Sequence, residues 1–278
     1  MIGTNKTSDV EISDIIKMMV GYTMHDRYPK MKNTSGKTIL KVDNLTCEPL
    51  YRNVSFELKE GEILGFSGLM GSGRTEIMQT IFGIIKKDSG KIIINDEEVK
   101  INSPIKARKY GIAYITENRK EEGLILDFSL SENIVLPNLK AILNKMKIID
   151  HKKQEKLAED YIKKLDIRTD SPKKIVQTLS GGNQQKIVVG KWLTTNPKIL
   201  ILDEPTRGVD VGAKYEIYEI MNELKEQGVA IIMISSELPE IIGMSDRVAV
   251  MHEGNLRGIL NKDECSQEKI MTLATGGK

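Results

Sequence analysis

The sequence predicts an α/β fold with a mixed β-sheet core and a helical insert, and three observations carry that prediction. The stretches "PKILILDEP" and "VAIIMISSE" each hold a short apolar run between polar residues, which is the pattern of buried parallel strands. A strand-like stretch, "EILGFSG", leads into a glycine-rich loop, and "RTEIMQTIFGII" after it has helical spacing. Residues from about 118 to 178 are charged and helical in pattern. Strands that alternate with helices favour a sheet covered by helices.

The other elements can be predicted in chain order. "SDVEISDIIKMMVGY" predicts a first helix, and "MHDRYPKMKNTSGKT", which Pro29 and Gly36 interrupt, predicts a linker. "ILKVDNL" and "RNVSFELKEGEILGFSG" predict strands, "GKIIINDEEVKI" predicts a hairpin, and "GIAYITE" predicts a further strand. Within the insert, "KKQEKLAEDYIKKLDI" places Leu157, Tyr161 and Leu165 on one face of an amphipathic surface helix.

The composition is that of an ordinary globular protein. The chain has 278 residues, of which 40% are hydrophobic and 29% charged, so it can form one large domain or two modest ones. A net charge of +2 gives no electrostatic case for nucleic-acid binding. Cys47 and Cys265 lie far apart in the sequence, which favours a reduced, cytoplasmic protein. Without an apolar run of about 18 residues, any membrane role is expected to be peripheral.

The glycine-rich stretch "GFSGLMGSGRT" nearly matches a phosphate-binding loop. The pattern is G-x-x-x-x-G-K-[ST], and only the lysine is replaced, by Arg74. Backbone N–H groups in such a loop form a nest for phosphate oxygens, and the hydroxyl of Thr75 is placed to bind Mg²⁺. The candidate nucleotide ligands are Gly68, Gly71, Ser72, Gly73, Arg74 and Thr75. Taken alone, the stretch is equally compatible with a turn that only needs positive φ at its glycines.

A second candidate site is "ILILDEPTRGVD", an apolar strand that ends in Asp203 and Glu204. Ligands of α/β folds bind at the carboxyl ends of the strands, where these carboxylates are expected. Asp203 can hold Mg²⁺ through water, and Glu204 can orient or deprotonate an attacking water molecule. The alternative is an exposed acidic strand end.

The third motif, "TLSGGNQQKIVVGKWL", predicts a capped helix. Ser180 can cap a helix that begins near Asn183, while Gly181 and Gly182 remove side chains from the approach to its N-terminus. Such a terminus can bind an anion. A helix cap without a ligand is the simpler interpretation of this motif alone.

Together, and in this order, the three motifs resemble those of the ATP-binding cassette (ABC) ATPases, over about residues 39 to 260. "ITENRKEEGL", "LSGGNQQK", "LDEPTRGVDVGAK" and "SSELPEIIGMSDRVAVMHEG" further resemble the second cassette of the tandem ATP-binding subunits of ribose-, galactose- and xylose-type sugar importers. The resemblance implies the P-loop NTPase fold of the ABC ATPase type, with ATP and Mg²⁺ as cofactors. It also implies an ATPase that drives the import of a simple sugar.

The resemblance also implies partners and a domain plan. In these ATPases two cassettes pack head to tail, so Ser180, Gly181, Gly182, Gln184 and Asp210 are expected to take part in nucleotide binding at a paired site. Residues 1–37 would be the tail helix and linker of a preceding first cassette, and residues 38–278 the cassette itself. Its helical insert, about 117–178, would dock on membrane permease subunits that act with an extracytoplasmic sugar-binding protein, and a C-terminal helix would span about 264–276. The expected location is peripheral, on the cytoplasmic face of the membrane.

Three positions depart from the family pattern. Arg74 replaces the loop lysine, Glu117 a glutamine, and Ser236 the switch histidine, while Tyr51 is the nearest aromatic residue for stacking on adenine. Arginine is bulkier than lysine, and serine cannot carry the proton chemistry of imidazole. The chain's own site is therefore expected to be slow or silent, with its signature motif completing a partner's site. The alternatives are a catalytically silent nucleotide-binding regulatory module and a non-transport ABC ATPase.

Overall fold

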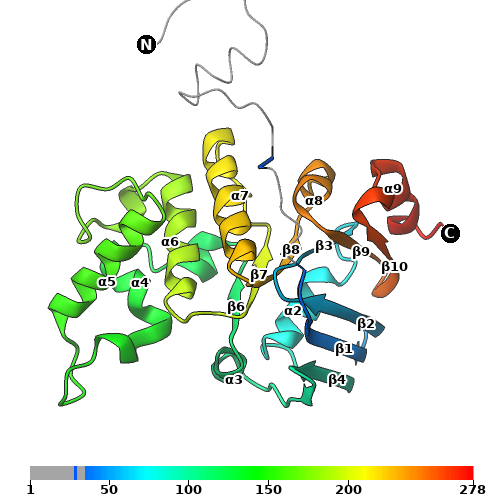
Figure 1. The fold of residues 1–278 in the computed structure, drawn as a ribbon, viewed down its shortest axis with the longest axis horizontal. Coiled ribbons are helices and arrows are strands. Elements are labelled where there is room, and N and C mark those ends of the chain that lie inside the picture. The colour runs from blue at the N-terminus through cyan, green and yellow to red at the C-terminus, as the bar shows by residue number, and fades with distance from the viewer. Residues whose placement is uncertain (1–27, 30–34, 278) are drawn as a thin grey trace, which may run out of the picture.

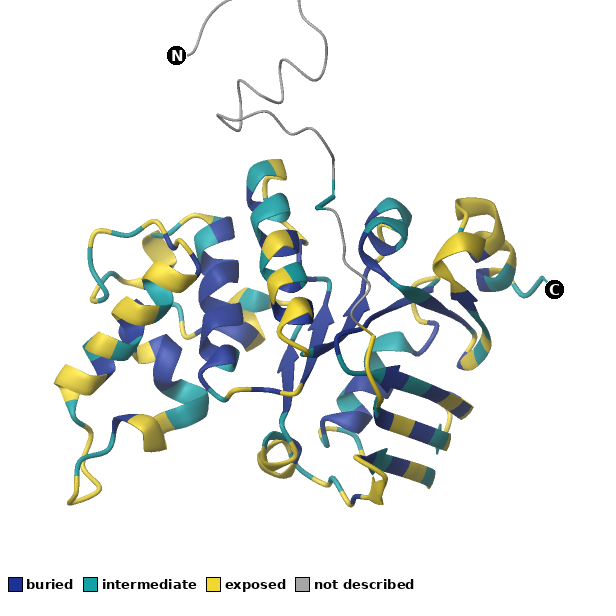
Figure 2. Ribbon diagram, in the orientation of Figure 1, coloured by how far each residue is buried: buried dark blue, intermediate teal, exposed yellow. Residues whose placement is uncertain are grey.

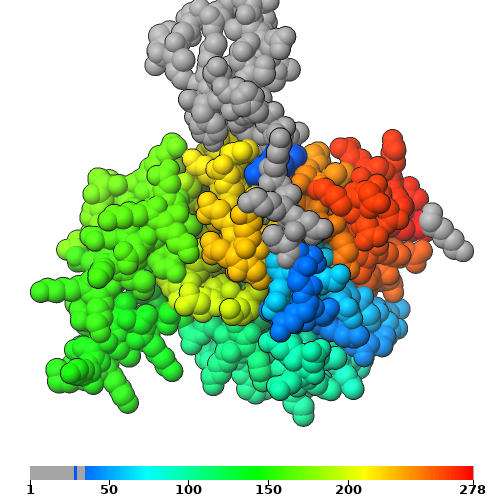
Figure 3. Space-filling view, viewed as in Figure 1, coloured from blue at the N-terminus to red at the C-terminus, as the bar shows by residue number. Residues whose placement is uncertain are grey.

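The computed structural model describes residues 28–29 and 35–277. The predicted first helix and most of the predicted linker lie outside these residues. Within them the chain forms two sheets, with helices around the larger one and a helical lobe at one end (Figure 1). Figure 3 shows this lobe in green, beside the surface of the other elements. The α/β class, the mixed sheet and the helical insert are confirmed.

The larger sheet has six strands in the order β10-β9-β3-β8-β7-β6. Its strands are β3 (Ile63–Gly68), β6 (Ile112–Ile115), β7 (Ile199–Asp203), β8 (Ala230–Ile234), β9 (Arg247–His252) and β10 (Asn255–Asn261). All pairs are parallel except β9 with β10. Every residue of β7 and β8 is buried (Figure 2), as their apolar runs predict. The parallel pairing brings the carboxyl ends of these strands to one edge.

The smaller sheet is antiparallel and has the order β2-β1-β4-β5. Its strands are β1 (Thr38–Cys47), β2 (Tyr51–Lys59), β4 (Ser89–Ile94) and β5 (Glu97–Glu98), and the last two form the predicted hairpin. Apolar side chains of β1, β2 and β4 share a buried cluster with β3 and with the helix that follows it. This packing fixes the glycine-rich loop against the smaller sheet.

Six helices accompany the sheets in the described ranges. They are α2 (Arg74–Ile81), α3 (Pro104–Lys109), α6 (Gly181–Leu193), α7 (Val211–Glu226), α8 (Leu238–Met244) and α9 (Gln267–Ala274). The last one lies within residues 264–276, where a C-terminal helix is expected. No helix within residues 28–29 and 35–277 combines the length and apolarity that crossing a bilayer requires.

The insert is helical, and its helices pack on one another and on α6. It contains η2 (Arg119–Gly123), α4 (Leu130–Val135), η3 (Leu136–Ile142), α5 (His151–Lys164) and η4 (Val176–Thr178). Ser129 and Glu132 form a capping box that starts α4. The predicted apolar face of α5 is confirmed, because Leu165 is buried and Leu157 and Tyr161 pack on the same core. That core is continuous with one face of the large sheet, so the insert is tied to the site.

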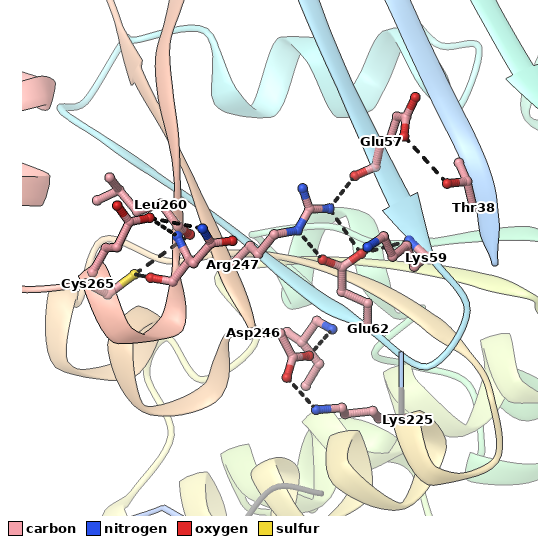
Figure 4. Close-up of polar contacts among 12 residues, drawn as sticks. Thr38, Glu57, Lys59, Glu62, Lys225, Asp246, Arg247, Leu260 and Cys265 are labelled. Atoms are coloured by element: carbon pink, nitrogen blue, oxygen red, sulfur yellow. Dashed lines mark hydrogen bonds and ion pairs between the residues drawn. The ribbon is translucent and has the colours of Figure 1, made fainter. Parts of the chain in front are cut away.

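Two ion pairs lie at the amino ends of β3 and β9, at the edge of the sheet opposite the glycine-rich loop (Figure 4). Arg247 Nε donates to Glu62 Oε1 over 2.6 Å, and the guanidinium also donates to the carbonyl oxygen of Glu57. The buried Lys225 pairs with Asp246 at 2.6 Å, and Asp246 also accepts from the backbone N–H of Ile63. These contacts hold the start of β3 and leave its other end to form the site.

Candidate nucleotide-binding site

The glycine loop, residues 68–75, connects β3 to α2 through left-handed backbone conformations. Gly68, Gly71 and Gly73 have φ values of 149°, 76° and 96°, which L side chains rarely adopt. A Cβ atom on Gly68 would lie 2.5 Å from the carbonyl oxygen of Met251, whereas one on Gly71 would meet nothing within 4 Å. The loop is therefore packed on one side and open on the other.

The open side faces a hollow of about 610 Å³ at the carboxyl edge of the large sheet. Its lining includes the whole glycine loop together with Glu117, Asp203, Glu204 and Ser236. These residues come from separate stretches of the sequence, and the parallel pairing of β3, β6, β7 and β8 brings them together. A turn that served only the backbone would not require three carboxylates and a hydroxyl opposite it.

Asp203 is the buried carboxylate of the site. Tyr114 donates its phenol hydrogen to Asp203 Oδ2 over 2.9 Å, and Thr75 also hydrogen-bonds to this side chain. Burial raises the pKa of Asp203, and the two hydrogen bonds and nearby Arg74 oppose that rise. Tyr114 is not among the predicted site residues, although strand pairing gives the signal: it lies beside Ile201 and so on the same face as Asp203.

Glu204 follows β7 in a strained backbone conformation. Its φ is 49°, in the left-handed region that costs a non-glycine residue of order 1–3 kcal/mol. Its N–H donates to the carbonyl of Ile234 over 2.9 Å, and Ser236 donates to its carboxylate over 3.2 Å. Burial raises the pKa of Glu204, while Arg74 lowers it. A carboxylate held this way is suited to accept a proton or orient water.

Arg74 lies between the loop and these carboxylates. Its guanidinium donates to the carbonyl oxygen of Ser235 over 3.1 Å, one residue before Ser236. Burial lowers the pKa of Arg74, and the negative charges of Glu204, Asp203 and Glu76 raise it. The arginine therefore brings a positive charge into the hollow and spans from the glycine loop to the end of β8.

Glu117 lies at the rim of the hollow and forms an ion pair with Arg207. The side chain of Arg119 donates to the carbonyl oxygens of Arg207 and Gly208, over 2.7 and 2.9 Å. Neither Arg119 nor Arg207 is among the predicted site residues. Both follow a strand of the sheet within a few residues, but their mutual contacts depend on loop conformations that no spacing predicts.

The signature loop, residues 179–184, lies outside the hollow. Ser180 is exposed and caps α6, and its hydroxyl accepts from the Asn183 side chain over 2.9 Å. Gly182 packs on α7, where an added Cβ would lie 2.5 Å from that of Ala213, and Asp210 caps the same helix. The structure thus groups Ser180, Gly181, Gly182 and Asp210 around the starts of α6 and α7, separate from the residues that line the hollow.

Two predicted ligands are turned inward. Gln184 is 4% exposed and donates to the carbonyl oxygens of Val176 and Leu179, so its side chain faces its own domain. A direct nucleotide contact by Gln184 is a prediction that this geometry does not favour. The expectation that Tyr51 stacks on adenine is wrong, because this side chain is fully buried and its hydroxyl donates to Thr80.

The residues of the hollow fit a magnesium nucleotide. Ser72 Oγ is buried, and within the described residues it has no hydrogen-bond partner, which leaves a polar atom of the glycine loop for a ligand. Thr75 and Asp203 supply oxygen atoms of the kind that Mg²⁺ prefers. No cluster of three or more His, Cys, Asp or Glu side chains that could hold a metal occurs in the described ranges. The donor set therefore suits an ion shared with phosphates, as nucleotide sites use it.

Comparisons with known proteins agree with this geometry. The family model described as ABC transporter matches residues 51–207. The protein named Ribose import ATP-binding protein RbsA in Bacillus cereus is 54% identical over 277 residues, which are 100% of this chain and 56% of that protein. The protein of the same name in Bacillus subtilis (strain 168) is 51% identical over 277 residues, again 100% and 56%. The chain thus spans about half the length of these curated relatives.

Solved structures support the fold. An ATP-binding cassette of an ABC transporter in its ADP conformation has a TM-score of 0.72 and 21% identity, with 87% of this chain and 100% of that chain covered. A nucleotide-free ATP-binding cassette from an ABC transporter also has a TM-score of 0.72, at 22% identity, with 86% and 100% covered. At these identities the likeness concerns the fold alone.

Proposed function

The chain belongs to the ABC transporter family of ATP-binding cassettes, and on that premise we propose that it is half of an ATP-binding subunit that couples ATP binding and hydrolysis to the import of a simple sugar. The observation that carries this proposal is the single hollow that joins the glycine loop to Asp203, Glu204 and Ser236. These relatives are named as ribose import proteins, so ribose is the first sugar to test.

Each side chain has a role that its surroundings support. The glycine loop and Arg74 bind phosphates, and Thr75 and, through water, Asp203 would hold Mg²⁺. Bound Mg²⁺ would neutralise phosphate charge and polarise the terminal phosphoryl group. Glu204 orients the attacking water and accepts its proton, which its raised pKa favours, and Ser236 holds Glu204 in place.

The chain's own site is the weaker of a pair. Arg74, Glu117 and Ser236 replace groups that stabilise phosphoryl transfer, and loss of one such group can slow a reaction by ~10²-fold or more. The signature loop is supplied to the partner cassette. Support for this comes from Ser180, which caps an exposed helix terminus away from the chain's own hollow. The first cassette is the proposed partner, and residues 1–37 are the proposed connection to it.

The remaining partners follow from the transport role. Membrane permease subunits dock on the insert, about residues 117–178, and an extracytoplasmic sugar-binding protein delivers the sugar to them. The cassette then works at the cytoplasmic face of the membrane as a peripheral protein. Its net charge of +2 offers no basis for nucleic-acid binding.

The test is steady-state Mg-ATP hydrolysis by the full chain, alone and mixed with the portion of the Bacillus cereus relative that lies outside the match. We expect little turnover alone, a clear rise on mixing, and loss of that rise in Ser180→Arg. Ser103→Arg, which changes the cap of the remote helix α3, is the matched control. Arg74→Lys should raise the turnover of the chain alone.

Two outcomes would change the assignment. Nucleotide binding with no turnover under any of these conditions would favour the silent regulatory module. Strong turnover by the chain alone, abolished by Glu204→Gln, would mean that Arg74 and Ser236 are tolerated and that the two sites do not differ as proposed.

A further inference from the structure

A buried carboxylate stands directly behind the site without lining it. Glu240, in α8, is 1% exposed. It accepts a hydrogen bond from Thr206 Oγ1 over 2.8 Å and another from the hydroxyl of Ser235. The hydroxyl of Tyr218, in α7, also hydrogen-bonds with Glu240, and burial raises the pKa of that tyrosine. The donors around this carboxylate are thus neutral hydroxyl groups from three separate segments.

Two of these donors belong to the loops that carry the site. Thr206 lies two residues after Glu204, in the loop that follows β7. Ser235 follows β8, its carbonyl oxygen accepts from Arg74, and the next residue, Ser236, donates to Glu204. Glu240 therefore sets the distance between the two strand ends on which Glu204 and Ser236 lie, although it does not line the hollow itself.

The third donor, Tyr218, contacts Tyr28, which lies before the first strand of the described chain. The ring of Tyr28 lies 5.4 Å from that of Tyr218, tilted by 46°. It also lies against Gly243 of α8, where an added Cβ would come within 2.4 Å of Tyr28 Cδ2. In Figures 1 and 3 the short blue segment at residues 28–29 lies between α7 and α8. Glycine at position 243 leaves the space that this aromatic ring fills.

We propose that Glu240 is a positioning residue for the nucleotide site and that Tyr28, seated between Gly243 and Tyr218, controls its position. When the Tyr28 ring is in place, Tyr218 and α8 hold Glu240 so that Ser235 and Thr206 bring Arg74, Ser236 and Glu204 together. When the ring leaves, α8 and the two loops lose this alignment. The segment before the cassette thereby acts on the site through a packed ring and a buried carboxylate. This inference rests on the proposed function.

The alignment matters most for the terminal phosphate of ATP. Glu204 and Ser236 serve the water that attacks that phosphate, whereas the glycine loop holds the nucleotide through backbone contacts that Glu240 does not touch. Loss of the Tyr28 contact should therefore weaken the binding of a nucleoside triphosphate more than the binding of a diphosphate. A general loss of folding would weaken both alike, which separates a positioning role from a merely structural one.

The experiment measures the dissociation constants of Mg-AMP-PNP and Mg-ADP by calorimetry, using the full chain. Gly243→Ala displaces the ring while raising the helix propensity of α8, and Tyr28→Ala removes the ring. Each variant is expected to raise the dissociation constant of Mg-AMP-PNP roughly tenfold more than that of Mg-ADP. This is the effect of about one lost hydrogen bond to a charged group. The double variant should lose no more than either single variant, because both act on one contact.

Glu240→Gln tests the carboxylate itself. Glutamine keeps the volume but presents one acceptor oxygen in place of two, so the same selective loss is expected. Glu237→Gln, an exposed carboxylate at the start of the same helix, is the matched control and should change neither constant. An unchanged ratio in Gly243→Ala and Tyr28→Ala, with both nucleotides still bound, would overturn this inference alone. A parent chain that binds neither nucleotide would overturn the proposed function and this inference with it.

Discussion

Replacing Tyr114 by phenylalanine removes one oxygen atom from the site and tests whether Asp203 is held as an ionised, buried carboxylate. The phenol donates to Asp203 over 2.9 Å, and both side chains are buried. A hydrogen bond to a charged group contributes about 1.5–3 kcal/mol, and phenylalanine fills nearly the same volume without leaving a cavity. Since Thr75 still hydrogen-bonds to Asp203, we expect a loss of about 2 kcal/mol in the free energy of unfolding. For a domain of this size that lowers the melting temperature by roughly 4–8 °C.

The pH dependence gives the sharper test. Burial already raises the pKa of Asp203 above its ordinary value of 3.8, and the bond from Tyr114 opposes that rise. Without the bond, the pKa of Asp203 in the folded state rises further. The variant should therefore become less stable than the parent as pH increases above 3.8, and the two should be equally stable below that pH. Urea unfolding between about pH 8 and about pH 4 would measure the difference. Tyr110→Phe, at an exposed tyrosine on a nearby turn, is the control. A loss equal at both ends of the range, or none at neutral pH, would refute the reasoning.

Three further perturbations follow from the same contacts. Glu204→Gln should stabilise the fold at neutral pH while abolishing turnover, because burial raises the pKa of Glu204; the gain in melting temperature should shrink as pH falls towards the ordinary value of 4.5 and be absent below it. Lys225→Met should cost about 3 kcal/mol in urea unfolding, since it leaves the partly exposed Asp246 without its buried partner; an unaffected midpoint would contradict this. Gly68→Ala, with its Cβ 2.5 Å from the Met251 carbonyl, should abolish Mg-ADP binding measured by calorimetry.

Local patterns in the sequence predict most of the fold because they reflect local physics. Apolar runs identify β7 and β8, since buried parallel strands have no polar face, and alternation with turns identifies the β4–β5 hairpin. The glycine loop is predictable because its backbone conformations admit few other residues. The burial of Gln184 is also predictable, because it lies three and four residues before the buried Ile187 and Val188, on the same face of α6.

Other features depend on contacts between distant segments of the chain, and the spacing of residues in the sequence does not predict them. From the sequence, Tyr51 is expected to be accessible for stacking. The fold instead buries it under α2, where its hydroxyl donates to Thr80. The pairing of Glu117 with Arg207 joins residues that lie 90 positions apart in the sequence, through two loops without regular periodicity. Tyr28 and Gly243 are a further case, because the space at a glycine has no sequence signature.

The ion pair between Glu117 and Arg207 changes the electrostatic argument about the chain's own site. A carboxylate at position 117 adds a negative charge near the phosphates, which costs nucleotide binding unless Mg²⁺ offsets it. In the structure Arg207, which also lines the hollow, neutralises that charge within the same chain. Both side chains are substantially exposed, so the pair itself adds little stability, but it removes most of the repulsion that Glu117 would exert. The electrostatic cost of Glu117 is then small, and the proposed weakness of the site depends mainly on Arg74 and Ser236. Since Arg74 retains its positive charge and contacts the segment that carries Ser236, nucleotide binding should survive better than hydrolysis.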